Sequence, residues 1–208
     1  MSRRVALGVF ARAPTPGLVK TRLVPALGAQ GPADVYAQLL KRMLDVAHAA
    51  PVDSRVLWVD TAAALPWFTS TAGFELAVQA DADLGTRMAA ACASMLAAHA
   101  VAIVVGSDLA DVTAADIALA VHWLKTDADV VLGPVADGGY WLLGVRGACP
   151  PLFDGIDWST PAVYAQTVAR LAALGADWRA LPLRHDVDDP EDLGMLRAAE
   201  ARALPRRG

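Results

Sequence analysis

The chain has 208 residues, of which 55% are hydrophobic and 19% are charged, and this composition excludes a disordered protein. The length suits one sizeable core, so we predict a single domain over residues 1–208. The net charge of −4 argues against a nucleic-acid partner, although the first 33 residues contain five basic and no acidic residues. A basic segment in an otherwise acidic chain predicts a small anion as the ligand.

Short apolar runs alternate with amphipathic helical patterns along the chain. The predicted strands cover residues 5–11, 55–59, 74–79, 101–106, 129–133 and 140–145. The predicted helices cover residues 33–49, 85–98, 114–125, 162–174 and 191–203. This alternation predicts an α/β fold with a mostly parallel central sheet and helices on both faces. In such sheets, ligands bind beyond the carboxyl ends of the strands.

Two stretches resemble membrane or export signals. Residues 88–107 carry no formal charge and are long enough in principle to span a bilayer. Their alanine-rich start, His99 and the β-branched residues that follow instead predict a helix and then a buried strand. The N-terminus resembles a short signal peptide, but Arg12 interrupts it and a first strand explains its apolar residues. Cys92 and Cys149 have no metal-site or disulfide spacing and are expected to be buried, so we expect a cytoplasmic protein.

The loop APTPGLVKTRL, which follows the first predicted strand, has the features of an anion-binding loop. Pro14 and Pro16 restrict the backbone, and Gly17 lets it approach a ligand closely. Lys20 and Arg22 add positive charge. The loop lacks the glycine spacing of a Walker A or dinucleotide-binding motif. We predict that it binds a polyphosphate; the alternative is an exposed basic loop that binds nothing.

The stretch GSDLADV places Asp108 at the end of the predicted strand 101–106. A carboxylate in that position can hold Mg²⁺, which would neutralise phosphates carried by the basic loop. In the alternative interpretation, Asp108 accepts hydrogen bonds from loop amides and Thr113 caps the next helix. Asp111 is expected to belong to the turn.

The stretch GPVADGGYWLLGV predicts a hairpin that turns at Asp137 and Gly138. A tight turn does not require the second glycine, Gly139. Because a glycine lets a ligand lie against the backbone, we predict an acceptor site here, with a simple turn as the alternative.

Two further polar stretches precede predicted helices. Ser159 or Thr160 is expected to cap one of them, at an N-terminus that could also bind an anion. Asp189 is expected to cap the last helix, whose acidic first turn suits the helix dipole. Asp186 and Asp188 are left without a structural role.

Six stretches of the chain resemble, in the same order, motifs of the radical-SAM/selenodomain-associated transferases, also called arsenosugar-biosynthesis glycosyltransferases. They are FARAPTPGLVKTRL, QADADLGTRM, GSDLADV, GPVADGGYWLLGV, FDGIDWST and DVDDPEDL. That family is similar to the nucleotide-diphospho-sugar transferase superfamily, which has a Rossmann-like glycosyltransferase-A fold. KTRL and DGG also resemble 2-phospholactate guanylyltransferase, and DVDDPEDL resembles the sugar cytidylyltransferases. The chain departs from the family at Ala80 and Ala82, where glycines are usual.

The resemblance implies roles for residues in these stretches. Lys20 and Arg22 are expected to contact phosphates, and Asp108 to bind a divalent metal. By analogy with the cytidylyltransferase motif, Asp188 is the expected second metal ligand, with Asp186 as the alternative. The other nucleotide-binding residues are expected to be Arg12, Pro16, Gly17 and Gly85.

We therefore predict a transferase that depends on Mg²⁺ or Mn²⁺, with Lys20, Arg22 and Asp108 as catalytic residues. Its donor is expected to be a nucleoside triphosphate or a nucleotide-sugar, and its acceptor a small molecule. Neither a nucleic acid nor a membrane is an expected partner, and the oligomeric state is left open. One alternative is a guanylyltransferase-like enzyme that releases pyrophosphate, and another is a non-catalytic nucleotide-binding regulator. The expected acceptor-binding residues are Asp137, Gly138, Gly139, Ser159 and Thr160.

Overall fold

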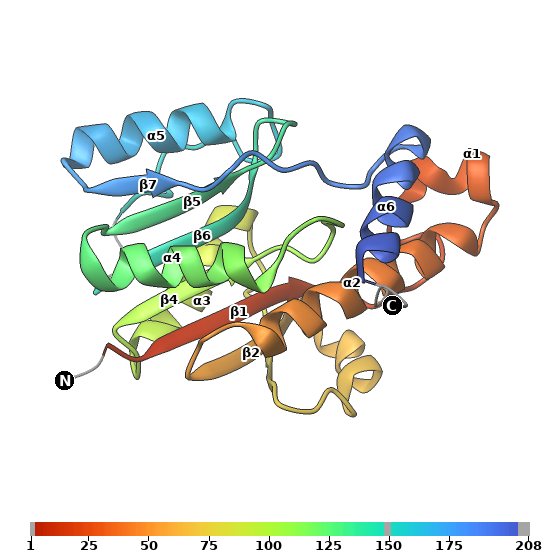
Figure 1. The fold of residues 1–208 in the computed structure, drawn as a ribbon, viewed down its shortest axis with the longest axis horizontal. Coiled ribbons are helices and arrows are strands. Elements are labelled where there is room, and N and C mark those ends of the chain that lie inside the picture. Colours follow the sequence, from red (N-terminus) through yellow and green to blue (C-terminus); the bar gives the residue numbers. More distant parts are fainter. Residues whose placement is uncertain (1–2, 148–150, 204–208) are drawn as a thin grey trace, which may run out of the picture.

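A seven-stranded sheet forms the centre of the structure, a computed structural model that describes residues 3–147 and 151–203 (Figure 1). The strand order is β3-β2-β1-β4-β6-β5-β7. Strand β6 is antiparallel to both neighbours, whereas the other described pairs are parallel. The predicted α/β fold with a mostly parallel sheet is confirmed. The strands are β1 (Val5–Ala11), β2 (Ser54–Val59), β3 (Glu75–Val78), β4 (Val101–Val105), β5 (Val130–Pro134), β6 (Tyr140–Arg146) and β7 (Trp178–Ala180).

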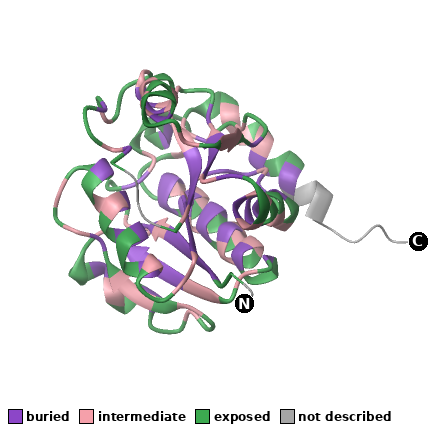
Figure 2. Cartoon of the chain, turned by 90° about the vertical axis from the view of Figure 1, so that its left-hand side faces the viewer, coloured by how far each residue is buried: buried purple, intermediate pink, exposed green. Residues whose placement is uncertain are grey.

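Helices cover both faces of the sheet, as predicted. Side chains alternate along each strand, so Leu7 and Val9 of β1 join a core with α2 and α4, while Ala6 joins a second core with α3 and α5. Burial on both faces explains why the central strands are continuous apolar runs. Figure 2 shows this burial in the strands and on the inner faces of the helices. The longer helices are α2 (Gly31–Ala49), α3 (Leu84–Leu96), α4 (Ala114–Thr126), α5 (Val163–Leu174) and α6 (Leu193–Ala203).

Helix α6 packs on α2 instead of on the sheet. Leu196 and Ala199 of α6 form a small separate core with Leu39 of α2. In Figure 1 this pair of helices lies at the end of the molecule toward which the β1 arrow points. The remaining helical segments are short: η1 (Thr21–Leu23), α1 (Val24–Leu27), η2 (Ala62–Phe68) and η3 (Pro190–Asp192).

Most of the predicted elements are present, with boundaries that differ by a few residues. Residues 88–107 form the rest of α3 and then β4, as expected, and no described helix is long and apolar enough to cross a membrane. Thr113 is confirmed as the cap of α4, and Asp189 caps η3, the short segment that leads into α6; each lies within a capping box. Cys92 is buried, as predicted, whereas Cys149 lies outside the described residues.

The prediction that Ser159 or Thr160 caps a helix is wrong. Helix α5 begins later, with Ala162 as its N-cap. Ser159 has a left-handed backbone, with φ of 63°, and the Thr160 hydroxyl donates to the carbonyl of Asp157 at 2.7 Å. The segment therefore forms a turn of its own before the helix.

Residues 181–188, which we call the strap, cross the edge of the sheet after β7. The amide of Arg184 donates to the carbonyl of Pro134 at 3.0 Å, and the amide of Val187 donates to the carbonyl of Asp108 at 3.2 Å. These contacts explain how Asp186 and Asp188 reach the end of β4, although they lie far from it in the sequence.

Arg184 also fastens the strap to the start of α4. Its guanidinium donates to Asp111 at 3.1 Å and to Asp116 at 2.7 Å, and all three side chains are largely buried.

We expect Arg184→Met to lower the free energy of unfolding by about 2 kcal/mol, because two poorly solvated carboxylates lose their cation. Urea unfolding measures this loss. The control is Arg179→Met, which removes an exposed pair with Asp127 and should cost less than about 1 kcal/mol. Equal losses of unfolding free energy in the two variants would show that Arg184 does not stabilise the attachment of the strap to α4.

Candidate active site

A cleft of about 900 Å³ opens at the carboxyl ends of β1 and β4 and the amino end of β6. The strand order reverses at β1, which lies between β2 and β4, and this is where sheets of this kind bind ligands. Pro16, Gly17, Gly85 and Gly138 do not line the cleft. The predicted site residues that do line it are Arg12, Lys20, Arg22, Asp108, Asp137, Gly139, Ser159, Thr160 and Asp188.

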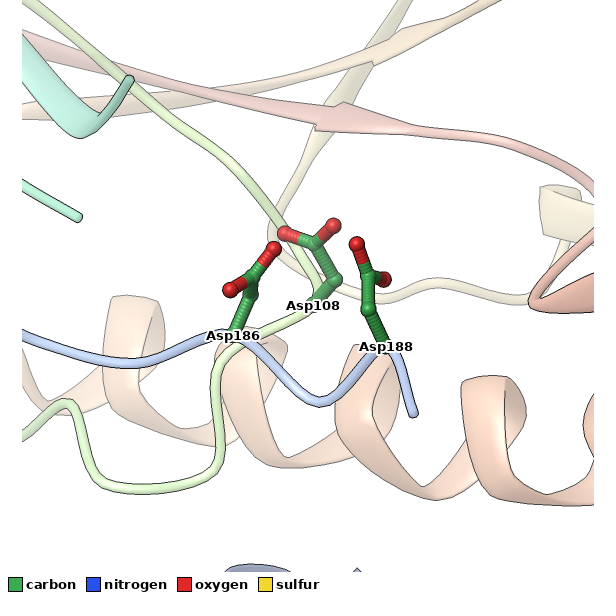
Figure 3. Close-up of side chains that lie close together, drawn as sticks. All are labelled: Asp108, Asp186 and Asp188. Carbon is green, nitrogen blue, oxygen red and sulfur yellow. The ribbon is translucent and has the colours of Figure 1, made fainter. Parts of the chain in front are cut away.

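Three carboxylates converge at one end of this cleft. Asp108 follows β4, and the strap contributes both Asp186 and Asp188 (Figure 3). Each offers an oxygen atom, and these oxygens lie within 4.8 Å of one another. The sequence left Asp186 and Asp188 as alternatives for one position, whereas the structure brings both to Asp108.

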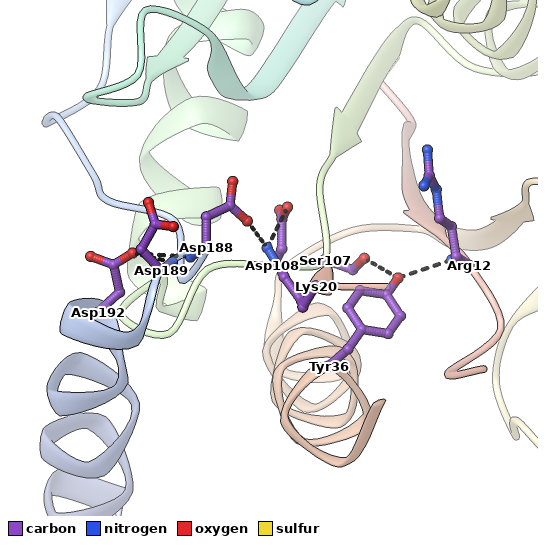
Figure 4. Close-up of polar contacts among 8 residues, drawn as sticks. All are labelled: Arg12, Lys20, Tyr36, Ser107, Asp108, Asp188, Asp189 and Asp192. Atoms are coloured by element: carbon purple, nitrogen blue, oxygen red, sulfur yellow. Dashed lines mark hydrogen bonds and ion pairs between the residues drawn. The ribbon is translucent and has the colours of Figure 1, made fainter. Parts of the chain in front are cut away.

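Lys20 lies between two of these carboxylates (Figure 4). Its Nζ is 3.2 Å from Oδ2 of Asp108 and 2.5 Å from Oδ1 of Asp188, and only 6% of the side chain is exposed. Arg22, by contrast, is 70% exposed and lies 3.9 Å from Asp189. The two cations expected to share one role therefore stand in different positions: Lys20 is buried among the carboxylates, and Arg22 faces solvent.

The packing of these charges shifts their protonation. Burial, together with the charges of Asp188 and Asp108, raises the pKa of Asp186 to about 7. Burial acts to raise the pKa of Asp188 as well, but the hydrogen bond and charge of Lys20 hold that pKa below its usual value. Burial acts to lower the pKa of Lys20, and the two aspartates raise it overall. The ammonium is thus firmly protonated, and the cluster retains net negative charge.

Tyr36 links the ends of the two strands that form the cleft. Its hydroxyl oxygen accepts from the amide of Arg12 at 2.9 Å and shares a hydrogen bond of 2.8 Å with Ser107 (Figure 4). The side chain is buried, and burial raises the pKa of the phenol. The hydroxyl thereby holds the start of the basic loop against the residue that precedes Asp108. In the sequence, Tyr36 stands out only as a member of the predicted helix 33–49, because a hydroxyl contact between distant segments leaves no local pattern.

We expect Tyr36→Phe to lower the free energy of unfolding by about 1 to 3 kcal/mol, because it leaves the partly buried amide of Arg12 and the buried hydroxyl of Ser107 without this partner. Thermal and urea unfolding of the purified variant measure the change. Tyr164→Phe is the matched control, since that hydroxyl makes no hydrogen bond within the described residues. A loss no larger than in the control would remove the bridging role.

Aromatic side chains also line the cleft. The rings of Tyr140 and Trp158 meet edge to face, with centroids 6.5 Å apart, and Phe153 packs on Trp158 from outside the cleft. Gly85 makes room for these rings, because a Cβ there would lie 2.4 Å from the Trp158 ring. Sequence reasoning assigned no role to Tyr140 or Trp158, although both lie within quoted motifs.

The two glycines of the hairpin have different surroundings. Gly138 has φ of 91°, and a Cβ there would lie 2.1 Å from the carbonyl oxygen of Pro161. A Cβ on Gly139 would meet only the Asp137 carboxylate, at 3.2 Å, and Gly139 lines the cleft. Gly138 is therefore required by backbone packing. Gly139 lacks a side chain at a position that lines the cleft, so it leaves space for a ligand.

Comparison with known proteins gives one family match. The profile of a family described as "Uncharacterized protein conserved in bacteria (DUF2064)" matches residues 43–160. A comparison with curated protein sequences gives no match. The finer resemblance to radical-SAM-associated transferases and to 2-phospholactate guanylyltransferase stays a prediction.

Solved structures resemble the whole chain. One is a protein from Desulfovibrio desulfuricans G20, whose assignment as a nucleotide-diphospho-sugar transferase is provisional. It is 29% identical, with a TM-score of 0.89 over 98% of this chain and 90% of that chain. CMP:2-keto-3-deoxy-manno-octonic acid synthetase complexed with CTP is 14% identical, with a TM-score of 0.62 over 97% of this chain and 100% of that chain.

A third similar structure is glucosyl-3-phosphoglycerate synthase from Mycobacterium tuberculosis, in complex with Mn²⁺, uridine diphosphate and glucosyl-3-phosphoglycerate. It is 12% identical, with a TM-score of 0.56 over 99% of this chain and 82% of that chain. These likenesses confirm the predicted glycosyltransferase-A type of fold.

Proposed function

The chain belongs to the DUF2064 family of bacterial proteins, and we propose that it is a divalent-metal-dependent transferase that uses a nucleotide-activated donor. One observation carries the proposal: a group of carboxylates and a group of basic side chains face the same cleft, beyond the carboxyl ends of β1 and β4. The carboxylates are Asp108, Asp186 and Asp188, and the basic residues are Arg12, Lys20, Arg22 and Arg87.

The carboxylates fit Mg²⁺ or Mn²⁺. Oxygen atoms are the ligands that these ions prefer, and Asp108, Asp186 and Asp188 offer three oxygens within 4.8 Å of one another. The contacts of the Lys20 ammonium with Asp108 and Asp188 support this, because they show that these carboxylates stabilise a cation. Asp108 and Asp188 would hold the ion, with Asp186 beside them. Once bound, the metal would offset charge that develops on the donor phosphates.

The basic side chains of the cleft would hold the donor. Arg22 is free to turn toward a ligand because most of its side chain is exposed. Arg12 follows β1 directly, and the Tyr36 bond to its amide fixes its backbone. Arg87 stands on α3 along the same cleft. Guanidinium groups bind phosphate through paired N–H donors, so these residues would orient the diphosphate of a nucleotide.

The acceptor would occupy the aromatic end of the cleft. Ser159 presents a hydroxyl group there, Thr160 lines the same part of the cleft with its hydroxyl hydrogen-bonded to the Asp157 carbonyl, and Gly139 leaves space beside the backbone. Trp158 and Tyr140 provide apolar ring surface on the same side. This combination of ring surface and hydroxyl groups suits a small polar molecule. The left-handed backbone of Ser159 adds support, because strained residues cluster at functional sites.

We assign a nucleotide-sugar as the donor, since the similar structure that covers 98% of this chain carries that provisional assignment. Nucleotidyl transfer from a nucleoside triphosphate is the alternative, and the likeness to a synthetase complexed with CTP supports it at the level of the fold. The two reactions differ in what they release. Sugar transfer from a diphospho-nucleotide donor releases a nucleoside diphosphate, whereas nucleotidyl transfer releases pyrophosphate.

Two measurements test the proposal. A thermal-shift screen of nucleotide-sugars and nucleoside triphosphates, with and without Mn²⁺, should single out one nucleotide that stabilises the protein only with the metal. Product analysis with that nucleotide and a panel of small polar acceptors should then detect a nucleoside diphosphate. Release of pyrophosphate would move the assignment to nucleotidyl transfer. Metal-dependent binding without turnover would indicate the regulator instead, and no binding of any nucleotide would overturn the proposal.

A further inference from the structure

Lys20 contacts carboxylates of the cluster, which a lysine that only binds phosphate would not need to do. Its ammonium lies within hydrogen-bonding distance of Asp108 and Asp188, two of the three carboxylates of the cluster. The Lys20 side chain is only 6% exposed, whereas that of Arg22 is 70% exposed, although both residues line the cleft. The ammonium thus occupies the position where a divalent ion would bind the same oxygens.

The backbone holds Lys20 in this orientation. Its φ of 45° and ψ of 42° are left-handed, a conformation that costs about 1 kcal/mol or more for a residue with a side chain. Val19 and Leu23 on either side are buried and anchor the loop. Of the residues other than glycine that the structure describes, Lys20 and Ser159 have a positive φ, and both line the cleft. The ion pairs with the aspartates therefore offset a locally unfavourable backbone.

A divalent ion and the ammonium cannot both bind these oxygens. Mg²⁺ binds carboxylate oxygens at about 2.1 Å, and the ammonium is 2.5 and 3.2 Å from them, so the two cations would be in close repulsive contact. A metal that binds either of these two oxygens therefore displaces Lys20 from that aspartate. The donor phosphates offer it a new partner in the same cleft.

We propose that Lys20 is an exchangeable gate of the metal site: it pairs with Asp108 and Asp188 before metal and nucleotide bind, and moves to the donor phosphates when they do. This inference rests on the proposed function and adds regulation to the same site. A metal that takes the oxygens now bonded to Lys20 displaces the ammonium, and the nucleotide receives it, so each ligand makes binding of the other more favourable. Such coupling is reciprocal by thermodynamic linkage.

The test is Mn²⁺ titration of the full chain by calorimetry, first without nucleotide. A lysine that serves only phosphate predicts no change in Mn²⁺ affinity when it is replaced. The gate predicts that Lys20→Met binds Mn²⁺ about fivefold or more tightly, because the competing cation is gone. Arg22→Met is the matched control: it removes one positive charge from the same loop but has no contact with Asp108 or Asp188. It should change nucleotide-free Mn²⁺ affinity much less than Lys20→Met does.

A second titration uses the nucleotide chosen by the thermal-shift screen. In the wild-type protein this nucleotide should strengthen Mn²⁺ binding, and in Lys20→Met most of that strengthening should be lost. Lys20→Gln provides a second neutral variant in case the methionine variant does not fold. Equal or weaker nucleotide-free Mn²⁺ affinity in the variant that folds would overturn the gate and leave the metal site standing. Absence of Mn²⁺ binding in every variant, with or without nucleotide, would overturn the proposed metal site and the gate with it.

Discussion

Asp108→Asn is expected to lower metal-dependent turnover by at least about 100-fold. Asp108 is central to the cluster, because it leaves β4 directly and its carbonyl accepts from the amide of Val187 in the strap. Asparagine keeps the size of the side chain but removes the charge that a divalent ion needs. The Mn²⁺ affinity of the variant, measured by calorimetry, should fall together with turnover.

The same substitution should cost little stability in metal-free buffer. Asp108 is partly exposed, and Lys20 keeps its shorter contact, with Asp188. We therefore expect a change in the free energy of unfolding of less than about 1 kcal/mol. Asp45→Asn, which alters an exposed pair with Lys41 on α2, is the control for a lost surface carboxylate. Wild-type Mn²⁺ affinity in Asp108→Asn would show that Asp108 is not a metal ligand. A loss of affinity together with a large loss in the free energy of unfolding would instead indicate that the role of Asp108 is purely structural.

Where local pattern determines structure, the sequence was a good guide. Residues 101–105 could be assigned to a buried strand because a parallel strand covered on both faces must be apolar throughout. Asp108 then followed as a candidate ligand, since the carboxyl edge of such a sheet is where ligands bind. Strand β7 was missed because an edge strand of three partly exposed residues, Trp178–Ala180, has no apolar run.

The contacts between distant segments could not be predicted in the same way. Nothing near Lys20 in the sequence shows that it adopts a left-handed backbone, and this conformation turns its side chain to the carboxylates instead of to solvent. The joint presence of Asp186 and Asp188 beside Asp108 depends on where the strap crosses the sheet. That path follows from β7 pairing outside β5, which only the folded chain defines.

The two neighbouring glycines of the DGG motif have different roles, which experiments can distinguish. Gly138 carries the turn: its carbonyl accepts from the amide of Tyr164 at 2.8 Å, and the backbone of Pro161 lies where a Cβ would be. Gly139 instead donates its amide to Asp137 at 2.8 Å and faces the cleft. A methyl group should therefore disturb folding at the first position and ligand access at the second.

We expect Gly138→Ala to lower the free energy of unfolding by about 3 kcal/mol, because the new Cβ meets a carbonyl at 2.1 Å and φ is 91°. Gly139→Ala adds the same methyl group one residue later, where its contact is a carboxylate at 3.2 Å, and should cost less than about 1 kcal/mol. Urea unfolding of both variants gives the comparison. Because Gly139 lines the cleft, its variant should weaken use of the acceptor while nucleotide binding stays close to wild type. Similar stability losses at both positions would show that the whole DGG motif serves only the turn, and the acceptor would then have to bind elsewhere in the cleft.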